Sequence, residues 1–382
     1  MLNRMYHLLR TRSFFLSVSV SFLVILSSLC PSVWCSKQPE IDSKMSVSIG
    51  KAFVTGGSGF VGQSLIQQLK KEGSKVVALA RSETAASKCK AAGADEVILA
   101  DVNSLSEDHA VQLQGCDVAF HLAAKVAIDG PLSEHMKDSF DGLVNVATRC
   151  RDAGVPSFVF CSSEQAVLRK HGWGDAKFDE ASLPPPENPQ KESLGPYATC
   201  KALCERWCRQ NNSPSFRTVI IRPRLIWGKG DTVVGTALQE AVDSGQMKWI
   251  GGGKALTSTT HVRNVVEGLL CGARKGVGGE AYYVVDPNEP LEVKAFFSEY
   301  VPALTGKTSI RKIGGAPFWA ARILGWVGLI PSASPYVLFT PCQIDDSKAR
   351  RDLGYVGHVS REEGMRELEH FEETKEERAP GS

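Results

Sequence analysis

Short apolar runs alternate with amphipathic stretches between residues 51 and 161. The apolar runs lie within residues 51–54, 75–81, 93–102, 116–124 and 157–161. Short apolar runs without polar alternation are typical of parallel strands that helices cover on both faces. Residues 64–73 and 138–153 lie between such runs and carry the hydrophobic spacing of helices. The pattern therefore predicts an α/β domain built on a parallel sheet.

A glycine-rich loop follows the first apolar run directly. Gly56, Gly59 and Gly62 recur every three residues between that strand and the next helix. Such glycines let the backbone turn tightly and approach a pyrophosphate, and the start of the helix favours the anion. The residues predicted to bind a dinucleotide here are Gly56, Gly57, Ser58, Gly59, Phe60, Val61 and Gly62. The predicted fold is a Rossmann-type doubly wound parallel sheet over residues 46–228, with a smaller C-terminal α/β substrate-binding part over 229–365.

The end of the second strand bears on the choice of cofactor. NAD-binding domains carry a carboxylate there for the ribose 2′-hydroxyl, whereas this chain has Ala80 and Arg81. A guanidinium offers a planar fork to a 2′-phosphate, so NADP(H) is favoured. NAD(H) stays open, because Arg81 could instead be a solvated strand-end residue. Asp101 and Val102 end the third strand and are expected at the adenine, and the small Ala123 lets the cofactor lie close.

Candidate catalytic side chains follow the fifth apolar run and recur on a later helix. Ser162 and Ser163 stand at the end of that strand, on the edge where open α/β sheets bind ligands. Tyr197 and Lys201 are four residues apart and share one helical face. Lys201 is expected to lower the Tyr197 pKa from about 10 towards the working pH, while Ser163 holds the substrate oxygen. His121 is expected to be a packed strand-end histidine rather than a catalytic one.

Together these motifs resemble those of the extended short-chain dehydrogenase/reductases. The resemblance covers about residues 47–368 and rests on Asp101 and residues 55–62, 121–125, 160–163, 196–201, 221–231, 258–268 and 281–290. Within that family the chain is most similar to the 3β-hydroxysteroid dehydrogenase branch. This branch includes sterol 4α-carboxylate 3-dehydrogenases and bacterial 2-alkyl-3-oxoalkanoate reductases. The marks of the branch lie at residues 222–228, 282–290 and 345–364.

The resemblance implies an enzyme that passes a hydride between C4 of a nicotinamide and a carbinol or ketone carbon. It implies Tyr197 as acid/base and Ser163 as the group that orients the carbonyl. Lys201 would contact the nicotinamide ribose, and Pro223, in the loop after the next strand, would lie at the nicotinamide end. Ser139 stands at the position where the family usually has Asn. The proton relay that the family builds on this Asn is therefore in question for this chain. The implied substrate is apolar: a sterol, or a lipid-derived β-keto or β-hydroxy acid.

Two other functions stay open. A nucleotide-sugar epimerase or dehydratase shares the fold and the Tyr/Lys pair, but usually carries an acid where Ala80 and Arg81 stand. A non-catalytic NADP-binding sensor would have the fold without the chemistry, and only Ser139 favours it.

Composition narrows the range of partners. The 382 residues hold 44 Lys+Arg and 42 Asp+Glu, a net charge of +2, which leaves no basic surplus for nucleic acid. The 11 Cys are spread thinly, so they are interpreted as buried small hydrophobes rather than a disulfide framework. Cys200, Cys204 and Cys208 recur every four residues, but no further ligands lie nearby in sequence, so they predict a packed sulfur stripe and no metal site. A homodimer stays open.

Both ends of the chain lie outside the predicted domain. Residues 1–35 combine a basic start with an uncharged apolar run, which predicts a signal peptide or signal anchor, and residues 36–45 form a linker. Either reading implies the endoplasmic reticulum or another endomembrane route, whereas a start at Met45 would give a cytoplasmic protein. The apolar strip 316–330 either rests on a membrane surface, lines the substrate mouth or is a core helix. Residues 366–382 are predicted to be a charged tail, made of a frayed helix and a solvated end.

Overall fold

The computed structural model describes residues 48–127, 130–170, 177–244, 248–305, 314–317, 319–321, 323 and 334–376. The predicted signal segment, the linker and residues 377–382 lie outside those ranges, as does most of the apolar strip 316–330. Within the described ranges, every helix is too short or too polar to cross a membrane.

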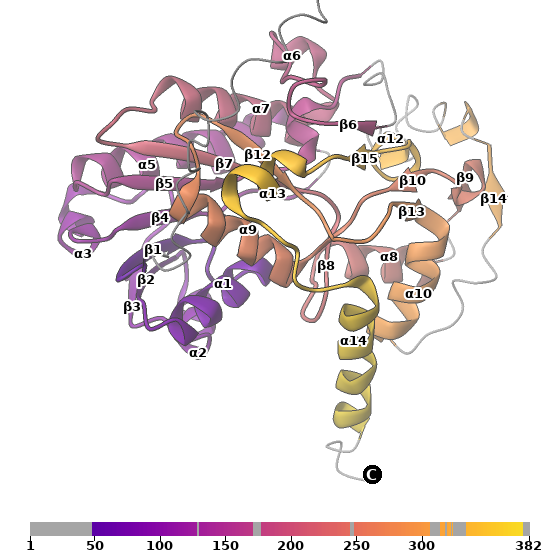
Figure 1. Cartoon of the computed structure of the whole chain (residues 1–382), viewed down its shortest axis with the longest axis horizontal. Coiled ribbons are helices and arrows are strands. Elements are labelled where there is room, and N and C mark those ends of the chain that lie inside the picture. Colours follow the sequence, from indigo (N-terminus) through magenta and orange to yellow (C-terminus); the bar gives the residue numbers. More distant parts are fainter. Residues whose placement is uncertain are drawn as a thin grey trace, which may run out of the picture. The chain divides into compact units, whose positions relative to one another are not determined.

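A parallel sheet of seven strands forms the centre of the domain, in the order β12-β7-β5-β4-β1-β2-β3 (Figure 1). Its strands are β1 (Lys51–Thr55), β2 (Lys75–Ala80), β3 (Glu96–Leu99), β4 (Val118–His121), β5 (Ser157–Cys161), β7 (Arg217–Pro223) and β12 (Ala281–Val284). The chain order reverses at β1, which pairs with β2 on one side and β4 on the other. Open α/β sheets bind ligands at such a reversal, outside the carboxyl ends of the strands.

Helices cover both faces of the sheet, which explains why its strands are largely apolar. One face packs against α1 (Phe60–Lys71), α2 (Glu83–Ala91), α9 (Val262–Lys275) and α13 (Ser347–Leu353). The other packs against α3 (Ala110–Leu113), α5 (Gly142–Asp152) and α7 (Gly195–Gln210). The predicted doubly wound fold is thereby confirmed. Cys200, Cys204 and Cys208 of α7 are buried in the hydrophobic core on this second face of the sheet, as predicted for a packed sulfur stripe.

A second group of elements follows β7 and has its own aromatic core. Its strands and helices are β8 (Ile226–Trp227), α8 (Val234–Asp243), β9 (Trp249–Ile250), β10 (Leu256–Thr257), β11 (Thr260–His261), β13 (Leu291–Glu292), α10 (Val293–Thr305), β14 (Gly315–Ala316) and α14 (Arg361–Glu376). Trp227, Trp249, Phe296 and Tyr300 are buried together in it. Between these elements in the sequence, β12 returns to the central sheet and pairs with β7.

Short elements complete the described chain. They are η1 (Glu107–His109), α4 (Leu132–His135), η2 (Met136–Asp141), η3 (Glu164–Val167), β6 (Lys177–Phe178), α6 (Pro189–Glu192), η4 (Gly251–Gly253), α12 (Ser334–Phe339) and β15 (Gln343–Ile344). The expected charged tail begins as a helix, because α14 continues to Glu376. Met365 and Leu368 bury the apolar side of its first turns in the aromatic core.

Candidate functional site

The glycine loop joins β1 to α1 with almost no space for side chains. Gly56 has a φ of +70°, and a Cβ on it would lie 2.8 Å from the backbone N of Ala123. A Cβ on Gly62 would lie only 2.1 Å from the carbonyl oxygen of Gly56. Gly59, which has no side chain, is the N-cap of α1, where the first N–H groups lack helical partners. The loop therefore fits a pyrophosphate held by backbone N–H groups.

A buried hydrogen-bond network braces this loop from the neighbouring strand. The Oγ1 of Thr55 lies 2.9 Å from Nδ1 of His121 and accepts a hydrogen bond from the backbone N of Ala123 at 3.3 Å. Burial, and then the charge of Lys201, lower the pKa of His121 to about 3. A neutral, buried His121 confirms the prediction of a packed strand-end histidine.

The structure brings the three predicted catalytic side chains together at the carboxyl edge of the sheet. Ser163 follows β5 and begins η3, while Tyr197 and Lys201 lie one turn apart on α7. The Lys201 Nζ donates a hydrogen bond to the carbonyl oxygen of Cys161 at 2.8 Å and lies 5.7 Å from the centre of the Tyr197 ring. Helix α7 also packs against η3, the element that Ser163 begins. Hydroxyl, phenol and ammonium thus meet two strands away from the glycine loop.

Comparison with known proteins identifies the family. A sequence profile of the 3-beta hydroxysteroid dehydrogenase/isomerase family matches residues 53–307. The chain belongs to this family. A ketoreductase of Stigmatella aurantiaca, named for 4-hydroxy-2-methyl-3-oxo-4-farnesyl-3,4-dihydroquinoline-1-oxide, is 38% identical over 82% of this chain and 94% of its own length. The decarboxylating sterol-4-alpha-carboxylate 3-dehydrogenase of Dictyostelium discoideum is 30% identical over 83% of this chain and 99% of its own length.

A solved structure extends the comparison to the fold. The dTDP-glucose 4,6-dehydratase of Streptomyces venezuelae, with NAD bound, matches with a TM-score of 0.66 at 20% identity, over 86% of this chain and 99% of that one. At that identity the likeness shows the shared fold alone. As a member of the 3-beta hydroxysteroid dehydrogenase/isomerase family, the chain is an NAD(P)-dependent oxidoreductase, as its motifs predicted.

Burial dominates the electrostatics of Tyr197 in this family member. Burial raises the pKa of the phenol above its usual value, the Lys201 charge opposes the rise, and Glu164 adds to it. Lys201 acts in the predicted direction, but the expected net fall of the Tyr197 pKa is wrong for the protein as described here, because burial outweighs the charge. Burial lowers the pKa of Lys201, but Tyr197 and neighbouring thiols raise it to a net value above normal. The ammonium therefore stays charged.

The residues predicted at the adenosine end lie on neighbouring strand ends, because β2 pairs with β3. Arg81 is exposed directly after β2, where a ligand phosphate could reach it. Asp101 is also exposed, and its Oδ1 accepts a hydrogen bond from the backbone N of Asn103 at 3.0 Å. Val102 packs against Gly142, on which a Cβ would lie 2.5 Å from the Val102 Cγ2. The packing of Val102 fixes the turn that holds Asp101.

Two predicted positions differ from expectation in detail. Pro223 is the last residue of β7 rather than part of the loop after it. Ser139, in the family's Asn position, lies buried in η2, and its Oγ accepts a hydrogen bond from the backbone N of Lys125 at 3.0 Å. The Ser139 oxygen is therefore engaged with the chain and differs chemically from the amide that the family usually has.

Sequence reasoning missed a buried ion pair beside Ser163. Ser163 donates a hydrogen bond from its Oγ to the Oε2 of Glu164 at 2.6 Å, and Arg224 donates one from Nη1 to the Oε1 of Glu164 at 2.7 Å. Glu164 and Arg224 are both buried. An acidic residue directly after two serines at a buried strand end was the available sign of this pair.

A second buried ion pair also consists of a glutamate and an arginine, and its glutamate accepts a hydrogen bond from the neighbouring serine. Ser162 donates a hydrogen bond from its Oγ to the Oε1 of Glu205 at 2.7 Å. Arg222 donates to both oxygens of Glu205, from Nε at 2.8 Å and from Nη2 at 2.6 Å. Burial opposes the ionisation of Glu205, but the Arg222 charge outweighs it and lowers the pKa of the carboxyl. Neighbouring serines thus donate to separate carboxylates, each neutralised by an arginine in or directly after β7.

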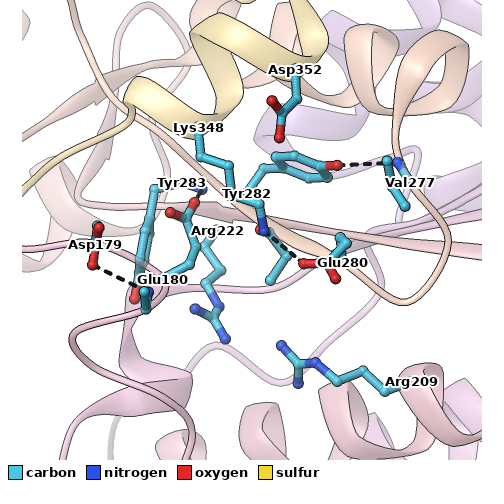
Figure 2. Close-up of polar contacts among 12 residues, drawn as sticks. Asp179, Glu180, Arg209, Arg222, Val277, Glu280, Tyr282, Tyr283, Lys348 and Asp352 are labelled. Carbon is cyan, nitrogen blue, oxygen red and sulfur yellow. Dashed lines mark hydrogen bonds and ion pairs between the residues drawn. The ribbon is translucent and has the colours of Figure 1, made fainter.

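A polar cavity of about 420 Å³ adjoins the second pair, with residues of α7, β7, β12 and α13 in its lining. Figure 2 shows the guanidinium groups of Arg209 and Arg222 turned toward the same space. In the lining of this cavity, Lys348 donates a hydrogen bond to Glu280 at 2.7 Å. Basic and acidic side chains therefore both line the cavity. This mixed charge makes the cavity a poor match for an apolar substrate.

Proposed function

We propose that this protein is an NADP(H)-preferring reductase that interconverts a ketone and a hydroxyl group on an apolar substrate. One observation carries the proposal: the Lys201 Nζ lies 5.7 Å from the centre of the Tyr197 ring on α7, and α7 packs against η3, which Ser163 begins, at the sheet edge where the glycine loop also lies. A dinucleotide whose pyrophosphate this loop would hold would supply or accept the hydride through its nicotinamide. The protein's own side chains hold the substrate oxygen and transfer one proton.

Each of the three side chains has one role in this proposal. Tyr197 donates its proton to the carbonyl oxygen in reduction and takes it back in oxidation. Ser163 holds the same oxygen through its hydroxyl. Lys201, anchored on the Cys161 carbonyl, places a fixed positive charge where the phenolate forms.

The apolar substrate class is supported by the relatives and by the surface of the second group of elements. The names of both relatives point to largely apolar substrates, a farnesylated ring system and a sterol. Leu256 of β10 is exposed, and so are Trp319 and Ile323 of the apolar strip 316–330. Exposed large apolar side chains mark an apolar binding site where they form one contiguous patch.

The NADP(H) preference is supported by Arg81. It stands after β2 at the position where a carboxylate would bind a ribose 2′-hydroxyl, and its side chain is exposed. A guanidinium there attracts a 2′-phosphate.

A substrate screen with a matched pair of variants tests the function. Oxidation of NADPH by the full chain is measured with ketosteroids, acyl β-keto acids and UDP-sugars. Tyr197→Phe is expected to abolish turnover and to leave cofactor binding, followed by fluorescence titration, unchanged. Tyr282→Phe removes a hydroxyl that bonds only the backbone of Val277 among the contacts described, and should keep full activity. Normal turnover by Tyr197→Phe, or turnover of UDP-sugars alone, would contradict the proposal.

We also propose that residues 1–35 direct the chain into the endomembrane system. The support is the order of a basic start and an uncharged apolar run. Fluorescent fusions of the full chain are expected at the endoplasmic reticulum, and fusions that start at Met45 are expected in the cytosol. The same distribution for both fusions would contradict this route.

A further inference from the structure

The polar cavity of about 420 Å³ has a lining of its own. Residues of α7, β7, β12 and α13 line it, together with Glu180 and Glu187 of the segment before α7. Its described lining includes neither the glycine loop nor Ser163, Tyr197 or Lys201. The volume lies within the range of small-molecule sites. The cavity therefore offers room for a second ligand, and the side chains around it decide which kind.

Arg222 presents a fixed guanidinium to this cavity. Only 1% of Arg222 is exposed, and its Nε and Nη2 donate to the two oxygens of Glu205 at 2.8 and 2.6 Å. Its Cζ lies 5.1 Å from the centre of the Tyr283 ring. The third nitrogen, Nη1, is buried and has no hydrogen-bond partner among the described residues. A buried N–H group without a partner is costly, so an acceptor oxygen is favoured at Nη1.

The charges beside Nη1 favour an anion there. Glu205 also accepts a hydrogen bond from Nη2 of Arg209 at 3.1 Å, so one carboxylate is shared by two guanidinium groups. These three side chains therefore carry one positive charge more than negative charge. Figure 2 shows both guanidinium groups turned toward the cavity. Converging guanidinium groups with spare charge are suited to a carboxylate.

The acidic side chains of the lining limit the charge of the ligand. Lys348 and Glu280 neutralise each other, with 2.7 Å between Nζ and Oε2. Glu180 accepts a hydrogen bond from the backbone N of Tyr283 at 2.7 Å, and Glu187 adds a second carboxyl group to the lining. These acids disfavour a ligand with two negative charges, whereas their oxygens can accept hydrogen bonds from ligand hydroxyl groups.

We propose that this cavity binds a small carboxylate with a single negative charge and several hydroxyl groups. Nη1 of Arg222 and the guanidinium of Arg209 donate to the carboxylate, and Glu180 and Glu187 accept from the hydroxyl groups. The site is separate from the one proposed for the reductase, and binding there forms and breaks no covalent bond.

Isothermal titration calorimetry of the full chain with sodium gluconate tests the site, with sodium chloride keeping the ionic strength constant. We expect saturable binding with a Kd of about 1 mM, as the ligand efficiency of small molecules gives for a molecule of this size. Glucose, which has the hydroxyl groups without the charge, and inorganic phosphate, which adds a second charge, should both bind more weakly. Absence of gluconate binding, or equal or tighter binding of either other probe, overturns the inference.

Two arginine variants locate the bound gluconate. Arg209→Gln leaves the buried pair of Arg222 and Glu205 in place, and its loss of a charged hydrogen bond should raise the Kd about tenfold. Arg351→Gln, which removes another partly exposed arginine far along the chain, should leave the Kd unchanged. An unchanged Kd in folded Arg209→Gln, or an equal rise in Arg351→Gln, places gluconate elsewhere and refutes the site.

A third variant probes Nη1 itself. Arg222→Lys keeps a positive charge beside Glu205 but has no atom equivalent to Nη1, so it should also raise the Kd at least tenfold. Full affinity in folded Arg222→Lys would overturn the assignment of Nη1. Arg209→Gln carries the test if Arg222→Lys fails to fold. The readout is binding alone, so failure of this site leaves the proposed reductase function standing.

Discussion

Lys201 donates its hydrogen bond to the carbonyl oxygen of Cys161, at 2.8 Å, and so ties helix α7 to the end of strand β5. Its Nζ lies 4.7 Å from the centre of the Phe160 ring and 5.7 Å from that of Tyr197. The ammonium therefore acts on the Tyr197 phenol through space, with its position set by the strand.

Removal of this charge should slow the reaction more in oxidation than in reduction. Lys201→Met keeps the length of the side chain but raises the pKa of Tyr197 further, since only Lys201 among the named causes offsets its burial by charge. We expect kcat/KM for alcohol oxidation to fall by about two orders of magnitude, within the range found for lost charge stabilisation. Lys348→Met is the control, because Lys348 lies in the same way over a tyrosine ring, that of Tyr282 at 4.7 Å. Equal effects of the two variants would contradict the role of Lys201.

Arg81 should decide which cofactor binds. Arg81→Glu places a carboxylate where a 2′-phosphate is expected, and we expect the Kd for NADPH to rise by about 10- to 100-fold, the weight of a charged hydrogen bond. The Kd for NADH should change less or fall, because a carboxylate suits a ribose 2′-hydroxyl. Fluorescence titration of both cofactors measures this, with Arg351→Glu, another exposed arginine, as the control. A parallel loss of both affinities would count against the assigned contact.

Gly62 should tolerate no side chain. The Cβ of Gly62→Ala would meet the Gly56 carbonyl oxygen at 2.1 Å, so α1 must move away from the loop. We expect a loss of about 1–3 kcal/mol in the free energy of unfolding, as for overpacked cores, together with weaker cofactor binding. Gly314→Ala should change neither, because a Cβ there meets open space. Urea unfolding and cofactor titration provide the two readouts. An unaffected Gly62→Ala would show that the loop is looser than described.

Lowering the pH should reduce the free energy of unfolding, because His121 is buried in its neutral form. Burial and the Lys201 charge lower its pKa from 6.5 to about 3, so between these values the unfolded chain binds a proton that the folded chain refuses. The free energy of unfolding therefore falls as the pH falls through this window, by about 1.4 kcal/mol per unit for this group. His121→Asn, which cannot titrate, should make the fall less steep in urea unfolding between pH 7 and 4. An unchanged slope in His121→Asn would exclude His121 as a source of acid sensitivity.

The parts of the site that could be predicted from the sequence are those encoded by short segments. The glycine loop occupies consecutive residues between a strand and a helix, and Tyr197 and Lys201 are one helical turn apart. Ser163 stands two residues after the end of β5. The geometry of such features is determined by the local sequence, so it can be predicted without knowledge of long-range contacts.

Other features depend on contacts that no short segment encodes. Glu164 and Arg224 are separated by 60 residues, and their pairing arises only when η3 and the end of β7 meet. The sign of the net shift in the Tyr197 pKa depends on how deeply the phenol is buried, which the spacing to Lys201 does not contain. A helix was expected in the charged tail, but its packing was not, because the burial of Met365 and Leu368 needs the aromatic core as a partner.

The return of β12 to the central sheet governs how the chain can be divided. Cutting after residue 228, at the predicted end of the nucleotide-binding part, would remove β12 and leave β7 as an open sheet edge. An exposed edge of that kind invites pairing with other chains and aggregation. It would also strip Arg224 of its partners on β10 and α12. The two groups of elements are therefore expected to melt in one transition, and a separately expressed nucleotide-binding half to be insoluble.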